Sequence, residues 1–249
     1  MPGSGISQTV ILAAGLGSRL AGAEAGTPKP LHTVAGLPLV VHALAHARAS
    51  GCDEAVIVIG HEGARVRQAV EALDGGLAVR FVENPDPTTP NGESLLVAEP
   101  YTRERFYLQM VDHLFAAPVL LQLPFSIPTP DARTVGSLLV DRAPGPELDL
   151  ADATKVRLEG DRVTAIGKAV EPWDAIDAGC FALTRGVFDA LRGVSPPEPR
   201  TVSSAMRQLA ARRALAFADL GSVRWVDVDT PADRETAERL LLTAAGRGV

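Results

Sequence analysis

Apolar segments of strand length alternate with helical patterns through the first half of the chain, and this alternation constrains the fold more than any other feature. The predicted strands are Thr9–Leu12, Ala55–Ile59, Val79–Glu83 and Phe106–Val111. The predicted helices between them are Val40–Ala49, Glu62–Leu73 and Ser94–Glu99. Strands and helices that alternate in this way form a mostly parallel sheet with helices on both faces.

The second half of the chain has a more antiparallel pattern. Gly160-Asp161 separates two strand-length segments and is typical of a two-residue hairpin turn. The predicted strands are Lys155–Glu159, Arg162–Ile166, Ala178–Leu183, Ala214–Ala218 and Val223–Val228. The predicted helices are Gly186–Leu191, Val202–Ala211 and a terminal helix that ends near Ala245. Thr230 and Asp233 form a capping box for the terminal helix. No linker or repeat divides the chain, so residues 1–249 are predicted to form one α/β domain with a mixed central sheet.

Composition excludes several classes of protein. The net charge of −6 argues against non-specific nucleic-acid binding, because proteins of that class carry a basic face. Cys52 and Cys180 are too few for a disulfide framework or a cysteine metal site, which favours a cytoplasmic location. Met1–Gln8 lacks the features of a signal peptide. No uncharged apolar segment reaches the roughly 18 residues of a membrane span, since Pro118 and Pro124 interrupt the longest candidate.

A glycine loop follows the first predicted strand, in the segment Leu12-Ala-Ala-Gly-Leu-Gly-Ser-Arg-Leu20. Gly15 and Gly17 have no Cβ, so the backbone can turn sharply and bring its N–H groups against a phosphate. The alternative is a tight turn that binds no ligand, which would have the same glycine spacing. Two other phosphate-binding motifs are excluded. A dinucleotide-binding loop needs glycine where Leu20 stands, and Gly167-Lys168 lacks the hydroxyl residue of a Walker A loop.

Two cations near this loop favour the phosphate interpretation. Arg19 lies within the loop segment, and Lys29 follows between Pro28 and Pro30. The prolines stiffen the backbone around the lysine, which a solvated lysine does not require, although ordinary turns also contain such prolines. A phosphate-binding loop with two separate cations suits a nucleoside triphosphate that is attacked at phosphorus.

Carboxylates at strand ends are candidates for a metal site. Asp112 follows the strand Phe106–Val111, at the edge where open α/β sheets bind ligands, and the alternative is a helix cap. Asp227 and Asp229 end a late strand two residues apart, so both side chains face the same way. Because Mg²⁺ takes one or two carboxylates plus phosphates, Asp112 is a candidate ligand, and Asp229 and Asp227 are both candidates for the second. His113 is expected to support Asp112.

These residues together resemble the signature of the sugar-phosphate and MobA-like nucleotidyltransferases, L-A-A-G-x-G-x-R-L followed by P-K-P-L. The resemblance implies a Rossmann-like GT-A fold and transfer of a nucleotidyl group from a nucleoside triphosphate to a phosphomonoester. It implies that Arg19 and Lys29 stabilise charge on the α-phosphate and on pyrophosphate, and that Asp229 is the second metal ligand. The residues implied to hold the base and the triphosphate are Leu12, Ala13, Ala14, Gly15 and Gly17.

Further segments are similar to one branch of this family, the inositol-1-phosphate cytidylyltransferases. They are Asn84-Pro85, Asn91–Leu96, Met110–Phe115, Asp152–Val156, Ile166–Lys168, Ala175–Gly179 and Asp227–Thr230. The likeness implies CTP and inositol 1-phosphate as substrates and Mg²⁺ as cofactor. The residues implied to line the base pocket are Asn91, Gly92 and Ser94. Lys168 is implied to bind the acceptor phosphate and Asp177 the acceptor hydroxyls, although a solvated lysine and a turn aspartate are the alternatives. Val111 departs from the branch, where a small serine is usual.

Other acceptor substrates and other classes of protein also fit these motifs. Phosphocholine cytidylyltransferases share the N-G-x-S region and the metal aspartates, and sugar-1-phosphate nucleotidyltransferases share the glycine loop. Asp227-Val-Asp229 fits the D-x-D motif of a GT-A glycosyltransferase, and a non-catalytic nucleotide-sensing module would also keep the loop. Some relatives are fused to a membrane CDP-alcohol phosphotransferase, so a separate protein of that kind is expected downstream. No nucleophile paired with a histidine is evident, and a phosphate dianion needs no general base.

Overall fold

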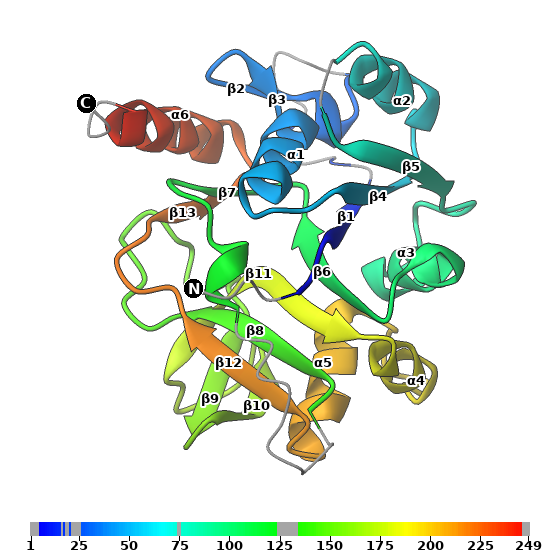
Figure 1. Cartoon of the computed structure of the whole chain (residues 1–249). Coiled ribbons are helices and arrows are strands. Elements are labelled where there is room, and N and C mark those ends of the chain that lie inside the picture. The colour runs from blue at the N-terminus through cyan, green and yellow to red at the C-terminus, as the bar shows by residue number, and fades with distance from the viewer. Residues whose placement is uncertain are drawn as a thin grey trace.

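The computed structural model describes residues 5–15, 17, 20, 26–73, 76–123 and 134–245. Its main feature is a nine-stranded sheet in the order β5-β4-β1-β6-β11-β8-β12-β10-β9 (Figure 1). In chain order these strands are β1 (Gln8–Ala13), β4 (Glu54–Ile59), β5 (Ala78–Glu83), β6 (Arg105–Met110), β8 (Gly136–Asp141), β9 (Lys155–Glu159), β10 (Arg162–Gly167), β11 (Ala175–Thr184) and β12 (Leu215–Asp219). Two short antiparallel pairs are separate from it: β2 (Thr33–Val34) with β3 (Leu37–Pro38), and β7 (His113–Phe115) with β13 (Trp225–Asp227).

The sheet is parallel in its first half and mainly antiparallel in its second. β1 pairs in parallel with both β4 and β6, and β4 does the same with β5. β11 runs antiparallel to β6 and to β8, and β10 runs antiparallel to β9. The predicted mixed sheet is therefore confirmed. That residues 1–249 form one domain stays a prediction.

β8 is a strand inside the sheet that the sequence pattern does not predict. Its apolar residues, Leu138, Leu139 and Val140, form a run too short to separate strand from helix by periodicity. Every residue of β8 is buried, between β11 on one side and β12 on the other. Its conformation therefore depends on pairing with strands that are distant in the sequence.

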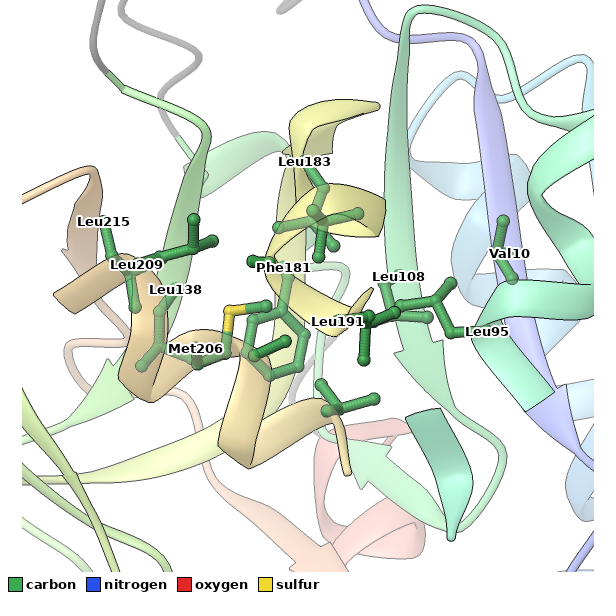
Figure 2. Close-up of a cluster of buried hydrophobic side chains, with 14 of the residues drawn as sticks. Val10, Leu95, Leu108, Leu138, Phe181, Leu183, Leu191, Met206, Leu209 and Leu215 are labelled. Carbon is green, nitrogen blue, oxygen red and sulfur yellow. The ribbon is translucent and has the colours of Figure 1, made fainter. Parts of the chain in front are cut away.

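Helices cover both faces of the sheet, as predicted. They are α1 (Leu39–Ala49), α2 (Gly63–Glu71), α3 (Asn91–Ala98), α4 (Gly186–Arg192), α5 (Val202–Ala211) and α6 (Pro231–Ala245). Successive strand residues point to opposite faces, so Val10 belongs to a core cluster with α3, α4 and α5, whereas Ile11 belongs to one with α1 and α2. Figure 2 shows part of the first cluster, with Leu95, Phe181 and Met206 from α3, β11 and α5. Within the described residues no helix is long and apolar enough to cross a bilayer.

Two local features bring side chains to one edge of the sheet. The capping box is present at α6, where Thr230 N donates to Asp233 Oδ2 at 2.7 Å and Asp233 N donates to Thr230 Oγ1 at 3.3 Å. In β11 the register with β8 shifts between Asp177 and Phe181, which marks a bulge. Gly179 in this bulge has a φ of +70°, a conformation that favours glycine.

Candidate active site

Lys29 is the centre of a buried charge cluster. It lies between Pro28 and Pro30 and begins a 3-10 turn, and only 10% of its side chain is exposed. Its Nζ atom donates to Asp112 Oδ2 and to Asp229 Oδ1, at 2.5 Å in each case. The fold thus brings together the lysine predicted to be catalytic and the two carboxylates predicted to bind metal. Their roles stay predictions.

The charges of the cluster determine its protonation. Burial lowers the pKa of Lys29, but the charges of Asp112, Asp229 and Asp227 outweigh burial and hold the pKa above its ordinary value. Burial raises the pKa of Asp112, but Lys29 and His113 outweigh burial and hold it below its ordinary value. Lys29 is therefore a cation and Asp112 an anion at neutral pH.

The glycine loop packs against Lys29. Gly17 has a φ of +61°, and a Cβ added there would overlap the Cβ of Lys29. Behind the loop, a Cβ added to Gly60 would lie 2.7 Å from the carbonyl oxygen of Ala14. Gly17 therefore lets the loop approach the lysine closely. Arg19, the second predicted cation, lies outside the described residues.

A cavity of about 840 Å³ opens over this cluster. The predicted site residues that line it are Gly15, Gly17, Lys29, Asn91, Asp112, Lys168, Asp177 and Asp229. A smaller cavity of about 150 Å³ shares part of this lining and adds Leu12, Ala13, Ala14 and Ser94. Residues that are far apart in the sequence therefore line two adjacent cavities, one large and one small.

Helix α3 carries the three residues predicted for the base pocket, and these residues differ in what they line and contact. Asn91 lines both cavities. Ser94 Oγ accepts a hydrogen bond from Asn84 Nδ2 at 2.9 Å, which leaves its own proton to donate. Gly92 lines neither cavity, and a Cβ added to it would overlap the carbonyl oxygen of Arg200. Packing between α3 and the loop before α5 thus accounts for this glycine.

The two residues predicted for acceptor binding also line the larger cavity. Lys168 forms an ion pair with Asp152, and 61% of the lysine side chain is exposed. Asp177 Oδ1 accepts a hydrogen bond from Gly179 N at 2.7 Å. Burial raises the pKa of Asp177 to about 6, although that hydrogen bond and the charge of His113 act to lower it. The cavity therefore combines an exposed cation with a desolvated carboxyl group.

Three further carboxylates line the cavity, and no role was predicted for any of them. Glu147, Asp149 and Asp152 lie in the segment between β8 and β9. Their acidic cluster is visible in the sequence, but it belongs to no predicted helix or strand. The resemblance of Asp152–Val156 to the cytidylyltransferase branch was therefore the signal in the sequence that this segment turns toward the site.

His113 lies beside the other oxygen of the Asp112 carboxylate. Its Nε2 atom is 3.8 Å from Asp112 Oδ1 and 3.7 Å from Asp227 Oδ2. Its ring stacks on Trp225 with 5.2 Å between centroids. Asp227 Oδ1 is buried and has no hydrogen-bond partner within the described part of the chain. A buried oxygen of this kind, beside two other carboxylates, fits a hard divalent cation such as Mg²⁺.

Comparison with known proteins identifies relatives over most of the chain. A family model described as the MobA-like NTP transferase domain matches residues 9–133. A Rubrobacter xylanophilus protein named bifunctional IPC transferase and DIPP synthase is 39% identical over 96% of this chain, which covers 52% of that protein. A CMP-5'-(3-aminopropyl)phosphonate synthase of Streptomyces rubellomurinus is 30% identical over 93% of this chain, which covers 38% of it. The chain thus spans about half the length, or less, of these two relatives.

A solved structure extends the comparison to the fold. The inositol-1-phosphate CTP transferase from T. maritima is 26% identical, with a TM-score of 0.85 and coverage of 98% of both chains. This likeness confirms the predicted Rossmann-like nucleotidyltransferase fold of the GT-A type.

Proposed function

The chain belongs to the family of MobA-like NTP transferase domains, and we propose that it transfers the cytidylyl group of CTP to inositol 1-phosphate. The observation that carries the proposal is the contact of Lys29 with Asp112 and Asp229 beside the glycine loop, under the larger cavity. Such a group suits a triphosphate and its metal. The likeness to the T. maritima inositol-1-phosphate CTP transferase supports the choice of both substrates.

The proposed reaction is an in-line displacement at phosphorus. An oxygen of the acceptor phosphate attacks the α-phosphorus of CTP, and the bond from that phosphorus to the α,β-bridging oxygen breaks. Pyrophosphate leaves with the electron pair, and CDP-inositol is the product. The attacking dianion needs no general base, so catalysis depends on orientation and on stabilisation of negative charge.

The residues around the glycine loop supply that stabilisation. Lys29 stays protonated, because its pKa is held above the ordinary value, and its ammonium group can bind phosphate oxygens. Backbone N–H groups near Gly15 and Gly17 can donate to the triphosphate. The resemblance gives Arg19 the role of a second cation on the departing pyrophosphate.

The proposed metal is Mg²⁺, held by Asp112 and Asp229, and proteins of this family generally use a divalent metal. When bound, a divalent cation would neutralise negative charge on the phosphates during the transfer. Lys29 keeps the two carboxylates together at the end of β6 and the start of α6.

The remaining residues of the proposal recognise the two substrates. Asn91 and Ser94 line the smaller cavity and bind the base, with the Ser94 hydroxyl as a donor. Lys168 binds the acceptor phosphate, for which it must exchange its contact with Asp152. Asp177 accepts hydrogen bonds from acceptor hydroxyls.

A second acceptor class is favoured by one observation. The carboxylate of Asp149 on the cavity wall suits a cationic acceptor, such as phosphocholine or an aminoalkyl phosphonate, whereas Glu147 is paired with Arg224 and Asp152 with Lys168. The similarity to the Streptomyces phosphonate synthase supports this alternative. A sugar 1-phosphate acceptor and a non-catalytic nucleotide sensor are the other candidates. The cytoplasmic location and a separate CDP-alcohol phosphotransferase downstream stay predictions.

A substrate panel tests the proposal. Purified protein with Mg²⁺ is mixed with each of the four nucleoside triphosphates and with inositol 1-phosphate, phosphocholine, aminopropyl phosphonate or glucose 1-phosphate, and pyrophosphate release is measured. We expect the fastest release with CTP and inositol 1-phosphate. Faster release with phosphocholine would reject the acceptor but keep the reaction. Nucleotide binding with no release for any pair would favour the sensor.

A further inference from the structure

The segment between β8 and β9, residues 142–154, forms one wall of the larger cavity and is called the acceptor segment below. It contains no helix or strand, yet six of its residues line the cavity: Glu147, Leu148, Asp149, Asp152, Ala153 and Thr154. The backbone hydrogen bonds that it makes with itself close short turns, such as Leu148 N to Gly145 O at 3.2 Å and Ala153 N to Asp149 O at 2.9 Å. Its position over the cavity therefore depends on contacts with other parts of the chain.

This segment lies on the side of the cavity where we propose that the acceptor binds. Lys168, proposed to bind the acceptor phosphate, forms an ion pair with Asp152. Asp177, proposed to bind the acceptor hydroxyls, donates its backbone N–H to Thr154 O at 2.9 Å. The smaller cavity, proposed to hold the base, is lined by none of residues 142–154, all of which the structure describes. A displacement of the acceptor segment would therefore change acceptor binding more than nucleotide binding.

Arg224 holds the acceptor segment through a bidentate contact with Glu147. Its Nε atom donates to Glu147 Oε1 at 2.8 Å, and its Nη2 atom donates to Oε2 of the same carboxylate. Exposed ion pairs usually contribute little, but a bidentate arginine–carboxylate pair has a fixed geometry. Only 14% of the Glu147 side chain is exposed, so water competes weakly for its oxygens. This pair therefore favours one position of the segment.

Gly145 makes room for this ion pair. A Cβ added there would overlap Nη2 of Arg224 and both carboxylate oxygens of Glu147. The φ of Gly145 lies outside the left-handed region, so its backbone is open to other residues. Because the overlapped atoms are the ends of flexible side chains, alanine at this position would displace the ion pair and leave the backbone in place.

Trp225, the residue after Arg224, holds the start of the acceptor segment. Its Nε1 atom donates to Asp141 Oδ2 at 2.9 Å, and Asp141 Oδ1 accepts a hydrogen bond from Ala143 N at 2.9 Å. Trp225 also begins β13, the strand that leads to Asp229. Two consecutive residues therefore connect the acceptor segment to the part of the chain that carries a proposed metal ligand.

From this geometry we propose that Arg224 and Glu147 are positioning residues that set the affinity of the site for the acceptor phosphomonoester. The guanidinium group holds the Glu147 carboxylate, and the pair holds the acceptor segment, which keeps Asp152 beside Lys168. The inference rests on the proposed transferase function but not on which phosphomonoester is the acceptor. It gives Glu147 a role in the site without direct contact with the acceptor.

Steady-state kinetics of Arg224→Gln, Glu147→Gln and the double variant test this role, with the best acceptor of the substrate panel and pyrophosphate release as the measurement. Each single variant should raise the KM for the acceptor about five- to tenfold and change kcat and the KM for CTP less than about twofold. The double variant should lose no more than either single variant, because each residue acts through the other. Gly145→Ala, which keeps both charges but displaces the pair, should raise the same KM.

Two further variants control for charge and for folding. Arg213→Gln breaks an exposed arginine–glutamate ion pair outside the cavity lining, so its KM for the acceptor should equal that of the wild type. Arg224→Lys keeps the charge but loses the bidentate contact, so it should recover only part of the acceptor affinity. Circular dichroism checks that each variant is folded, and Arg224→Lys replaces Arg224→Gln if the latter is unfolded.

Hydrogen exchange measures the position of the acceptor segment without any substrate. Amides of residues 142–154 should exchange at least about threefold faster in Arg224→Gln than in the wild type, whereas those of α3 should be unchanged. Unchanged exchange of the segment, an unchanged KM for the acceptor, an equal rise in the KM for CTP, or losses that multiply in the double variant would each overturn the positioning role. A wild type that releases no pyrophosphate with any acceptor would instead reject the proposed function, and the exchange measurement would still test the ion pair.

Discussion

The ammonium nitrogen of Lys29 lies 2.5 Å from Oδ2 of Asp112, which joins residues 83 positions apart in the sequence. The same nitrogen lies 2.5 Å from Asp229 Oδ1, near the other end of the chain. A charge-assisted contact of this kind, largely removed from water, fixes the 3-10 turn that begins at Lys29, the end of β6 and the start of α6 against one another. The proposed catalytic groups are thus held by one another as well as by the sheet.

Replacing Lys29 tests its role in catalysis. Lys29→Ala should lower kcat/KM by a factor on the order of 10² or more, the scale of one preorganised charge at a reacting phosphate. The control is Arg67→Ala, which removes an exposed cation from α2. Steady-state rates of pyrophosphate release measure both variants. Near-normal turnover of folded Lys29→Ala would remove this residue from the mechanism.

Two glycine substitutions separate backbone strain from contact with His113. Gly160 and Gly179 both have positive φ, but a Cβ meets open space at Gly160 and the His113 ring at Gly179. Gly160→Ala should cost roughly 1–2 kcal/mol of stability from the left-handed backbone alone. Gly179→Ala should cost a further 1–3 kcal/mol or so from overpacking. Urea unfolding measures both, and equal losses would show that the ring contact contributes nothing.

The raised pKa of Asp177 predicts a dependence of stability on pH. Its pKa is about 6 in the folded protein, against 3.8 for an exposed aspartate. Between these values the folded state holds a proton that the unfolded chain has released, so this group's contribution to stability falls as pH rises from about 4 to 6. Asp177→Asn keeps an acceptor for Gly179 N but cannot ionise.

The variant should therefore gain stability relative to the wild type across that window and keep a constant difference above about pH 7. Urea midpoints of both proteins, measured at intervals from pH 4 to pH 8, check this. Parallel curves for the two proteins would show that Asp177 has an ordinary pKa.

The hydroxyl of Ser94 is expected to contribute to recognition of the base. Ser94→Ala should raise the KM for CTP about 5- to 10-fold, the equivalent of one hydrogen bond, and leave kcat nearly unchanged. Ser50→Ala is the control, because it removes a buried hydroxyl that donates to His46 O at the end of α1. Loss of kcat with unchanged KM for CTP would contradict a role in nucleotide binding.

Elements with a strong local pattern were predictable. α5 has the predicted bounds, Val202–Ala211, and the capping box of α6 is present. Helix α3 begins at Asn91, three residues before the predicted start, because asparagine and glycine are weak helix formers and hide its first turn. β8 was missed, because its apolar run is short and the strand depends on distant partners.

In the candidate site, too, local sequence patterns predicted individual residues, whereas contacts between distant segments could not be predicted. Lys29 and Asp112 could be named from loop and strand-end patterns, but their contact depends on tertiary packing. Gly92 was predicted to line the base pocket, which stays a prediction, and its close packing against Arg200 is a tertiary contact that the sequence does not reveal. The hydrogen bond between His113 and the carbonyl oxygen of Ala178 depends on the bulge in β11, which a sequence pattern does not reveal.

The most direct test of the proposed reaction follows oxygen atoms through it. Inositol 1-phosphate labelled with ¹⁸O in its three non-bridging phosphate oxygens is incubated with CTP, Mg²⁺ and the protein, and the products are analysed by ³¹P NMR and mass spectrometry. Attack on the α-phosphorus predicts CDP-inositol that retains all the label, one labelled oxygen becoming the new bridge, together with an equal amount of unlabelled pyrophosphate. Label in pyrophosphate, or CTP left intact with every acceptor of the panel, would contradict the account.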